Sequence, residues 1–195
     1  MDRSIAILPN ELAYIARAKE EPSAFAAIYE HYFSRVYNYI RYRINDSDIT
    51  DDLTADTFES ILANIKSFQP EKGSFATWAS AIARNTVNSY LRKQRFRNWF
   101  SIDSIKNEAS SEPEPEQLQL ENEQQIELLV AIEGLSTRDK DVLALKFGAG
   151  LSNSEISKLT GLNQNNVNVS VYRAVRRLQG LLNHKDKEDG NYERK

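Results

Sequence analysis

A short segment near the C-terminal end of the chain carries amide, aromatic and guanidinium side chains at helical spacing. They occur in the stretch LSNSEISKLTGLNQNNVNVSVYRAVRRLQGLL, residues 151–182. Amides can pair with the edges of DNA bases, and guanidinium groups can bind phosphates or guanine. The pattern therefore predicts nucleic-acid recognition on one exposed helix face. The residues expected on that face are Asn168, Tyr172, Arg173, Arg176 and Arg177.

These side chains need a helix to present them, and the preceding residues predict a helix–turn–helix pair. Ser152 is expected to cap the first helix, where Glu155 completes a capping box three residues later. Gly161 follows where a tight turn requires a positive φ or a close helix approach. In such a pair the second helix enters the DNA major groove, so the pattern predicts DNA as the partner. The positions expected to be buried are Ile156, Leu159 and Leu162 in the first helix and Val167, Val171, Leu178 and Leu181 in the second.

A second group of cations and amides lies in the middle of the chain. No acidic residue occurs from Lys72 to Ile102, whereas acids gather at 46–59 and 103–123. Phosphate contacts are local and screened, so this segregation matters more than the net charge of −3. An ordinary solvated helix face is the alternative, and the absence of acids on this helix counts against it. The residues predicted to share a nucleic-acid-binding face are Arg84, Asn88, Arg92 and Arg95, with Asn85 beside them.

Acidic side chains at 51–59 raise the possibility of a catalytic carboxylate pair. They fall in the opening turns of a predicted helix, where carboxylates interact favourably with the helix dipole. No histidine, lysine or nucleophile is spaced to work with them, and no metal-ligand spacing is present. The cluster is therefore expected to dock another protein, and the chain is expected to be neither an enzyme nor a metal or cofactor binder. The cluster consists of Asp51, Asp52, Asp56 and Glu59.

The composition excludes several classes of protein. The chain has no cysteine and only two histidines, His31 and His184, so disulfide scaffolds and thiolate or histidine-rich metal sites are not expected. No run approaches the roughly 18 apolar residues of a membrane span, and the N-terminus has no signal-peptide core. We therefore expect a cytoplasmic protein that does not insert into a membrane.

Hydrophobic periodicity predicts an all-α protein, because no segment alternates as a strand would. Two small helical domains are expected, since a Ser-, Glu- and Pro-rich stretch without apolar periodicity separates two helical segments. The assignments are residues 1–98 for the first domain, 99–121 for a flexible acidic linker, 122–183 for the second domain and 184–195 for a disordered tail.

Long amphipathic helices are expected to close a small aromatic core in the first domain. Trp78 is assigned to that core by its spacing from Phe75 and Ile82, whereas Tyr39 and Tyr42 fall off their apolar stripe and are expected to face a partner. The helices predicted in the first domain are 11–19, 23–44 (capped by Ser23), 48–67 and 74–97. In the second domain, a helix is predicted at 124–133. Another starts at a Ser136/Asp139 capping box ahead of the helix–turn–helix and carries the apolar residues Val142, Leu143, Leu145 and Phe147.

Several longer strings carry a resemblance to a known family. The first domain contains AFAAIYEHYFSRVYNYI, DDLTADTF and FATWASAIARNTVNSYLRKQR, and the second contains LSTRDKDVLALKF ahead of the helix–turn–helix. In these strings and their order, from about Ser23 to Leu182, the chain resembles bacterial RNA polymerase sigma factors of the extracytoplasmic-function (ECF) group. The most specific part is FxxWxxxIAxN, followed at this distance by a helix–turn–helix.

The resemblance implies a sigma factor whose partners are core RNA polymerase and promoter DNA, with an anti-sigma factor as a further candidate partner. The first domain would be similar to sigma region 2, which docks on the clamp coiled coil and recognises the −10 element. The second would be similar to sigma region 4, which docks on the flap and reads the −35 element. For the polymerase, the resemblance implies contacts from Asp52, Asp56 and Glu59. For the −10 element it implies Arg84, Asn85, Asn88, Arg92 and Arg95, with Asn85 holding an extruded base. For the −35 element it implies base-edge contacts from Asn168, Val169, Tyr172 and Arg173, and phosphate contacts from Asn165, Asn166, Arg176 and Arg177.

The alternative is a helix–turn–helix regulator that does not join the polymerase, with the first domain as a sensor or dimerisation module. The second basic face, Arg84–Arg97, favours the sigma interpretation because a regulator would leave that face unexplained. Asn168 stands where members of the family often carry a cation, so their base preference cannot be transferred to this chain.

Overall fold

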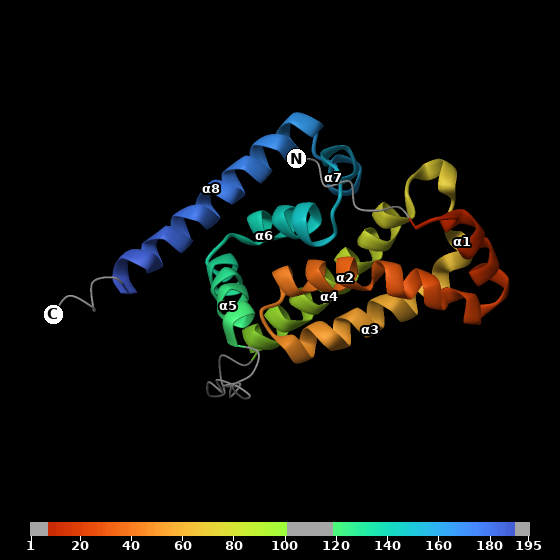
Figure 1. Ribbon diagram of the computed structural model, residues 1–195, viewed down its shortest axis with the longest axis horizontal. Coiled ribbons are helices and arrows are strands. Elements are labelled where there is room, and N and C mark those ends of the chain that lie inside the picture. The colour runs from red at the N-terminus through yellow and green to blue at the C-terminus, as the bar shows by residue number, and fades with distance from the viewer. Residues whose placement is uncertain (1–7, 101–118, 190–195) are drawn as a thin grey trace.

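The chain folds into helices and the turns between them over the residues that the computed structural model describes, 8–100 and 119–189 (Figure 1). No strand occurs in these two ranges, which confirms the all-α prediction. Most of the predicted linker and the last six residues of the predicted tail lie outside them. The helices within residues 8–100 form what we call the first unit, and those within residues 119–189 form the second unit.

The helices of the first unit begin and end close to where the sequence predicts. Asp46 caps α3, because its carboxylate accepts a hydrogen bond of 2.9 Å from the backbone nitrogen of Ile49. The predicted cap at Ser23 is wrong: Pro22 starts a short 3-10 turn, and α2 begins only after it without a side-chain cap. The elements are α1 (Glu11–Glu20), η1 (Pro22–Phe25), α2 (Ala26–Arg43), α3 (Ser47–Asn64), η2 (Ile65–Ser67), η3 (Pro70–Lys72) and α4 (Phe75–Phe100).

An aromatic cluster forms the centre of the first unit, where α2, α3 and α4 pack together. The ring of Phe75 is fully buried and lies 5.1 Å from Tyr32, 5.2 Å from Phe68 and 5.3 Å from Trp78 between ring centroids. These tilted and edge-to-face arrangements avoid the direct face-to-face stacking that aromatic rings disfavour. Trp78 therefore belongs to the core, as its spacing predicts.

In the second unit, α7 and α8 form the helix–turn–helix, and α8 packs against α5 and α6. Gly150 ends the segment after α6 with a φ of 70°. Phe147, predicted with the apolar residues of this segment, is 56% exposed because α6 widens into a π-helical turn that changes the helical register. The elements are α5 (Gln119–Glu133), α6 (Thr137–Leu143), the π-helical η5 (Ala144–Gly148), α7 (Asn153–Thr160) and α8 (Gln164–Asp189), which continues into the predicted tail.

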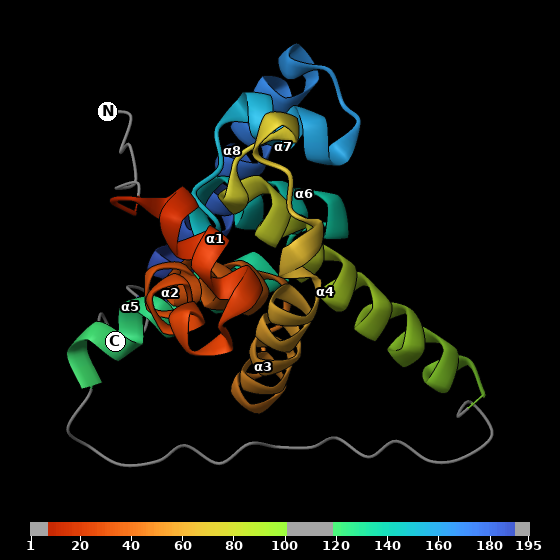
Figure 2. The same cartoon turned by 90° about the vertical axis from the view of Figure 1, so that its right-hand side faces the viewer.

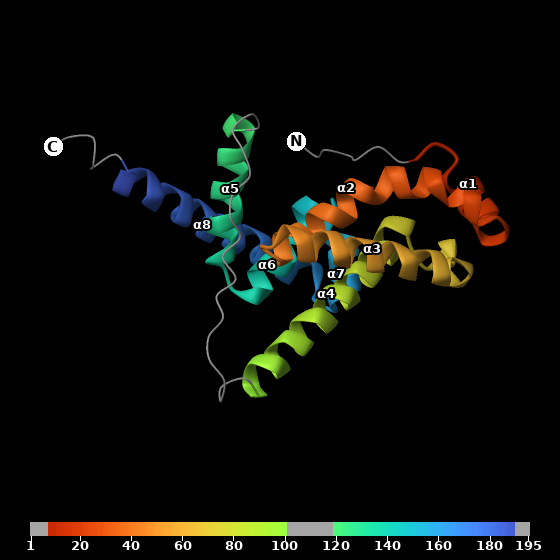
Figure 3. The ribbon, with the colours of Figure 1, turned by 90° about the horizontal axis from the view of Figure 1, so that it is seen from below.

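The two units pack against each other through α2, which contacts both α6 and η5. Buried residues of both units, among them Ile40 of α2 and Leu145 of η5, belong to one apolar cluster. Tyr39, predicted to face a partner, is completely buried by the second unit of its own chain, whereas Tyr42 is half-buried. We call this packing the closed arrangement. The C-terminal part of α4 projects away from it, as Figures 2 and 3 show.

Candidate nucleic-acid interface

The helix–turn–helix forms as its sequence predicts. Ser152 and Glu155 make a reciprocal capping box: the backbone nitrogen of Ser152 donates to the Glu155 carboxylate at 2.9 Å, and that of Glu155 donates to Ser152 Oγ at 3.3 Å. Gly161 ends α7 in the left-handed region, with a φ of 73°. Ile156 and Val167 are fully buried between α7 and α8. This local geometry fixes the angle at which α8 leaves the turn.

The predicted reading face of α8 is solvent-exposed throughout. Tyr172 is 63% exposed, and the guanidinium of Arg176 lies 5.8 Å from the centre of its ring. Leu181, predicted to be buried, is 37% exposed because its side chain lies beside Gly134 at the end of α5 rather than over the core. The exposed residues from the predicted −35 set are Asn165, Asn166, Asn168, Val169, Tyr172, Arg173, Arg176 and Arg177.

One residue of this face already has an ionic partner. Arg177 forms an ion pair with Asp139, whose carboxylate also accepts a hydrogen bond of 2.9 Å from Ser136 Oγ. The Arg177 side chain nevertheless remains 59% exposed. It can therefore reach a phosphate while still supporting the start of α6.

The second predicted face, on α4, is divided by the closed arrangement. Asn85, Arg92 and Arg95 are exposed, whereas Arg84 and Asn88 are half-buried. Arg84 Nε donates to Asp141 of α6 at 2.9 Å, and Asn88 Oδ1 accepts a hydrogen bond of 3.2 Å from Arg43 of α2. Of the predicted −10 surface, Arg84 is therefore held by the second unit, and Asn88 by Arg43 of the first unit.

Asp141 is the centre of a buried polar cluster that sequence reasoning missed. Its carboxylate accepts hydrogen bonds from Tyr39 Oη at 2.9 Å, from Arg43, and from Arg84. Burial and the Asp141 carboxylate together raise the pKa of Tyr39, so the phenol stays protonated and can donate. The one sequence signal was the spacing of Tyr39 and Arg43, which places them four residues apart on one face of α2.

Glu155 makes a second polar link between the units. Its carboxylate accepts hydrogen bonds from Ser74 Oγ at 2.6 Å and Thr77 Oγ1 at 3.0 Å, both at the start of α4. Burial alone would raise the pKa of Glu155, but the hydrogen bonds donated by Ser74, Ser152 and Thr77 outweigh it and lower the pKa. The ionised carboxylate thus holds α7 against α4.

Replacing Glu155 by glutamine is expected to lower the free energy of unfolding at neutral pH. Because the folded pKa lies below the ordinary value of 4.5, the ionised carboxylate contributes stability above that pH, which is lost as the pH falls through the folded pKa. Urea unfolding of the wild type and E155Q at neutral pH and at about pH 3 measures the difference. Glu20→Gln, at an exposed site, is the control. A deficit that is equal at both pH values would contradict this role.

The acidic cluster of α3 points away from the core. Asp51, Asp52, Asp56 and Glu59 are all exposed, while Leu53 and Phe58 between them are buried. In the described part of the chain no three His, Asp or Glu side chains gather as metal ligands would. None of the described helices combines the length and apolar character that a membrane crossing requires.

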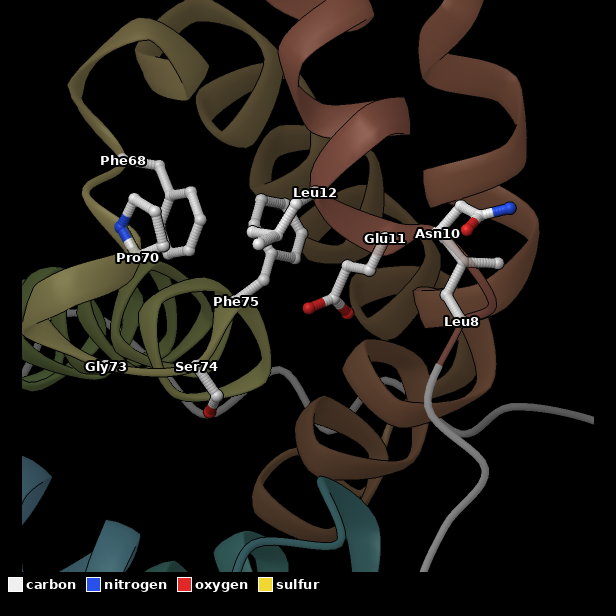
Figure 4. A pocket seen from close by; sticks show the side chains of 9 residues that line it. All are labelled: Leu8, Asn10, Glu11, Leu12, Phe68, Pro70, Gly73, Ser74 and Phe75. Atoms are coloured by element: carbon white, nitrogen blue, oxygen red, sulfur yellow. The ribbon is translucent and has the colours of Figure 1, made fainter.

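A shallow hollow of about 490 Å³ lies between the start of α1 and the turn before α4 (Figure 4). Glu11 is the one ionisable residue among those that line it, and its carboxylate accepts a hydrogen bond from Tyr32. Its other walls are mainly apolar, with Leu12, Phe68 and Phe75 among them. This hydrogen bond links the start of α1 to α2, and no sequence feature predicts the hollow.

Comparisons with known proteins match both units. Residues 28–97 match the family described as Sigma-70 region 2, and residues 125–178 match Sigma-70, region 4. The chain is 33% identical over 162 residues to the ECF RNA polymerase sigma factor BldN of Streptomyces coelicolor, covering 83% of this chain and 61% of that protein. It is 24% identical to the ECF RNA polymerase sigma factor SigX of Bacillus subtilis, covering 80% of this chain and 81% of that one.

Two solved structures share the fold. The sigma factor RpoE of Bartonella quintana, in complex with the anti-sigma factor NepR, aligns with a TM-score of 0.66 and 22% identity, over 82% of this chain and 96% of that one. CnrH, in complex with the cytosolic domain of CnrY, aligns with a TM-score of 0.65 and 18% identity, over 88% and 96%. Both alignments cover most of this chain, so this protein and the two solved structures share the same fold across both units.

Proposed function

This chain belongs to the ECF group of the sigma-70 family, and we propose that it binds core RNA polymerase and directs transcription initiation at particular promoters. The observation that carries the proposal is the presence of an exposed polar face on α8 and a partly exposed one on α4, in units that match sigma regions 2 and 4. The chain spans 61% of the length of BldN, so the activity and partners rest on the matched units. It acts by recognition and supplies no catalytic group.

Each face has a distinct task in this proposal. Asn168, Val169, Tyr172 and Arg173 read base edges of the −35 element, because they form the exposed strip of α8 that a major groove can accept. The exposed part of α4 captures the −10 region, with Asn85 holding an extruded base. The remaining phosphate contacts are Asn165, Asn166, Arg176 and Arg177 at −35 and Arg84, Asn88, Arg92 and Arg95 at −10.

Protein partners follow from the same membership. The α3 residues Asp52, Asp56 and Glu59 dock on the clamp coiled coil of the polymerase, and the second unit docks on the flap. The two solved structures of similar fold are complexes, one with the anti-sigma factor NepR and the other with the cytosolic domain of CnrY. An anti-sigma factor is accordingly a proposed partner of this chain, and the cytoplasm is its proposed location.

Transcription in vitro tests the proposal. Purified core polymerase would be mixed with this protein and a library of genomic DNA fragments, and the start sites would be mapped. We expect starts at a small set of shared promoter sequences that depend on the added protein. Core polymerase that starts at the same sites with and without the protein would overturn the proposal. A helix–turn–helix regulator is not favoured, because residues 28–97 match sigma region 2.

Replacing Arg173 by alanine is expected to weaken promoter binding of the holoenzyme by about 1–3 kcal/mol and to relax one −35 position. The guanidinium is exposed on the reading face, so its loss removes a base contact without opening a cavity. Fluorescence anisotropy with a set of single-base promoter variants measures both effects. Arg17→Ala removes the same charge from an exposed site on α1 and is the control. Unchanged binding and base preference in R173A would show that Arg173 does not read the promoter.

A further inference from the structure

Two arginines of the first unit converge on a single carboxylate of the second. Arg43 contacts Asp141 Oδ1, Arg84 Nε donates to Oδ2 at 2.9 Å, and Tyr39 Oη donates to Oδ1 at 2.9 Å. The Arg43 side chain is 2% exposed and the Arg84 side chain 29%. The arrangement is a largely buried anion-binding site with three donors.

The donors and the acceptor belong to different units. Tyr39 and Arg43 lie on α2 and Arg84 on α4, so the first unit alone builds the site, and Asp141 of α6 enters it from outside. Two guanidinium groups and a hydroxyl are also the donors that bind a phosphate, because phosphate and carboxylate oxygens accept the same charge-assisted hydrogen bonds. The first unit thus supplies all three donors of this anion site.

The site continues the predicted nucleic-acid face of α4. Arg43 Nη2 donates to Asn88 Oδ1 at 3.2 Å, which joins the site to the row that runs on through Arg92 and Arg95. Both of the latter are exposed. A strand that follows α4 would therefore bring its next phosphate to Arg84 and Arg43.

We propose that Arg43 and Arg84 form a binding site for a nucleic-acid phosphate, and that Asp141 occupies this site in the closed arrangement. This inference rests on the proposed function, since it assigns a further contact to the DNA-binding surface. The phosphate and the carboxylate are both anions and need the same donors, so they exclude each other. DNA binding at this site and closure of the two units are consequently competing equilibria.

Removal of α6 without a replacement anion is unfavourable. It would leave two guanidinium groups side by side with no counter-charge on a partly dry surface. A phosphate supplies that charge, so DNA stabilises the separated units, while the closed arrangement suppresses binding until a partner or DNA displaces Asp141.

A steric variant can open the interface without altering any charge. A Cβ atom added at Gly148 would lie 2.8 Å from the backbone nitrogen of Tyr39 and 2.9 Å from the backbone carbonyl of Asn38. These are backbone atoms and cannot rotate away, so Gly148→Ala should push η5 off α2. Gly180→Ala is the matched control, since nothing lies within 4 Å of a Cβ at that position.

The test measures DNA affinity of the full chain without polymerase. The probe is a fluorescein-labelled single-stranded DNA of about 20 nucleotides and mixed sequence, titrated at about 0.15 M salt. We expect Asp141→Asn and Gly148→Ala each to bind about tenfold more tightly than the wild type. Combining Arg43→Gln with Asp141→Asn should remove the gain. Glu20→Gln loses one exposed negative charge and should change affinity less than about twofold.

Several outcomes would overturn the proposal. Equal affinities of D141N and E20Q would mean that only net charge matters, and a gain that survives in the Arg43→Gln combination would place the phosphate elsewhere. If Asp141→Asn proves unfolded by circular dichroism, Gly148→Ala carries the test, and wild-type affinity in an open Gly148→Ala protein is then the refuting result.

A distance measurement tests the competition directly. The chain has no cysteine, so Lys66→Cys and Lys158→Cys at exposed positions can place one dye on each unit. Saturating DNA should lengthen the dye separation in the wild type, and binding without a change in separation would refute the competition. Neither the affinity measurement nor the distance measurement uses polymerase. A failure to direct transcription would therefore refute the proposed function, whereas the phosphate site and its competition with closure are tested by these two measurements alone.

Discussion

Replacing Asp52 and Asp56 together with lysine is expected to abolish association with core RNA polymerase. Both carboxylates are exposed on α3, so the fold should tolerate the change. Reversing two charges turns attraction at a protein interface into repulsion, which costs several kcal/mol and weakens binding by about a thousandfold or more. Co-elution with core polymerase in gel filtration, together with start-site selection, measures the loss.

The control for this variant reverses two charges elsewhere. Glu20 and Glu30 are exposed on α1 and α2, and their replacement by lysine changes the net charge by the same amount. This control should retain polymerase binding, and circular dichroism should give the same helix content for all three proteins. A D52K/D56K protein that still co-elutes with the polymerase would show that the docking surface lies elsewhere.

Features that depend on neighbours in sequence could be predicted from sequence alone. The capping box at Ser152 and the positive φ of Gly161 follow from local hydrogen bonding and local sterics. The apolar period of α2 likewise identifies Ile28, Val36 and Ile40 as buried. The exposure of Asn168 and Arg173 follows from the same periodicity. What they bind remains a prediction.

Features that depend on the packing of the two units could not be predicted in this way. Tyr39 lies 102 residues from Asp141 in the sequence, and nothing near either residue indicates the other. The helical spacing predicts that Arg84 and Asn88 share a face, but not that Asp141 of α6 binds Arg84. A helix that is buried on two sides has two buried faces. On α2, Tyr39 and Arg43 belong to the face that contacts the second unit. Polar groups at those positions weaken the hydrophobic signal, so periodicity does not predict that this second face of α2 is buried.

The shared core has a consequence for unfolding. Ala144 and Leu145 of η5 belong to the same buried cluster as Ile28 and Ile40 of α2. Neither unit can lose its packing without exposing apolar surface of the other. We therefore expect the two units of the isolated chain to unfold together, even though they match separate families.

Replacing Phe75 by alanine is expected to lower the free energy of unfolding by about 3–5 kcal/mol. Its side chain is fully buried and contacts the rings of Tyr32, Phe68 and Trp78, so truncation leaves a cavity that three rigid rings cannot refill. Phe96→Ala on the same helix removes a ring that is 66% exposed and should cost less than about 1 kcal/mol. Urea unfolding followed by tryptophan fluorescence and by circular dichroism gives both values.

Unfolding of the same Phe75→Ala variant also distinguishes one core shared by the two units from two independent cores. A dye on Lys158→Cys, in α7, reports on the second unit, while tryptophan reports on the first. Because the cluster is continuous, loss of the Phe75 ring in the first unit should move both transitions to the same lower urea concentration. A variant in which the tryptophan transition shifts and the dye transition stays at its wild-type midpoint would show that the second unit is stable alone. The closed arrangement would then contribute nothing to its stability, and α6 could leave Arg43 and Arg84 at no cost in apolar packing.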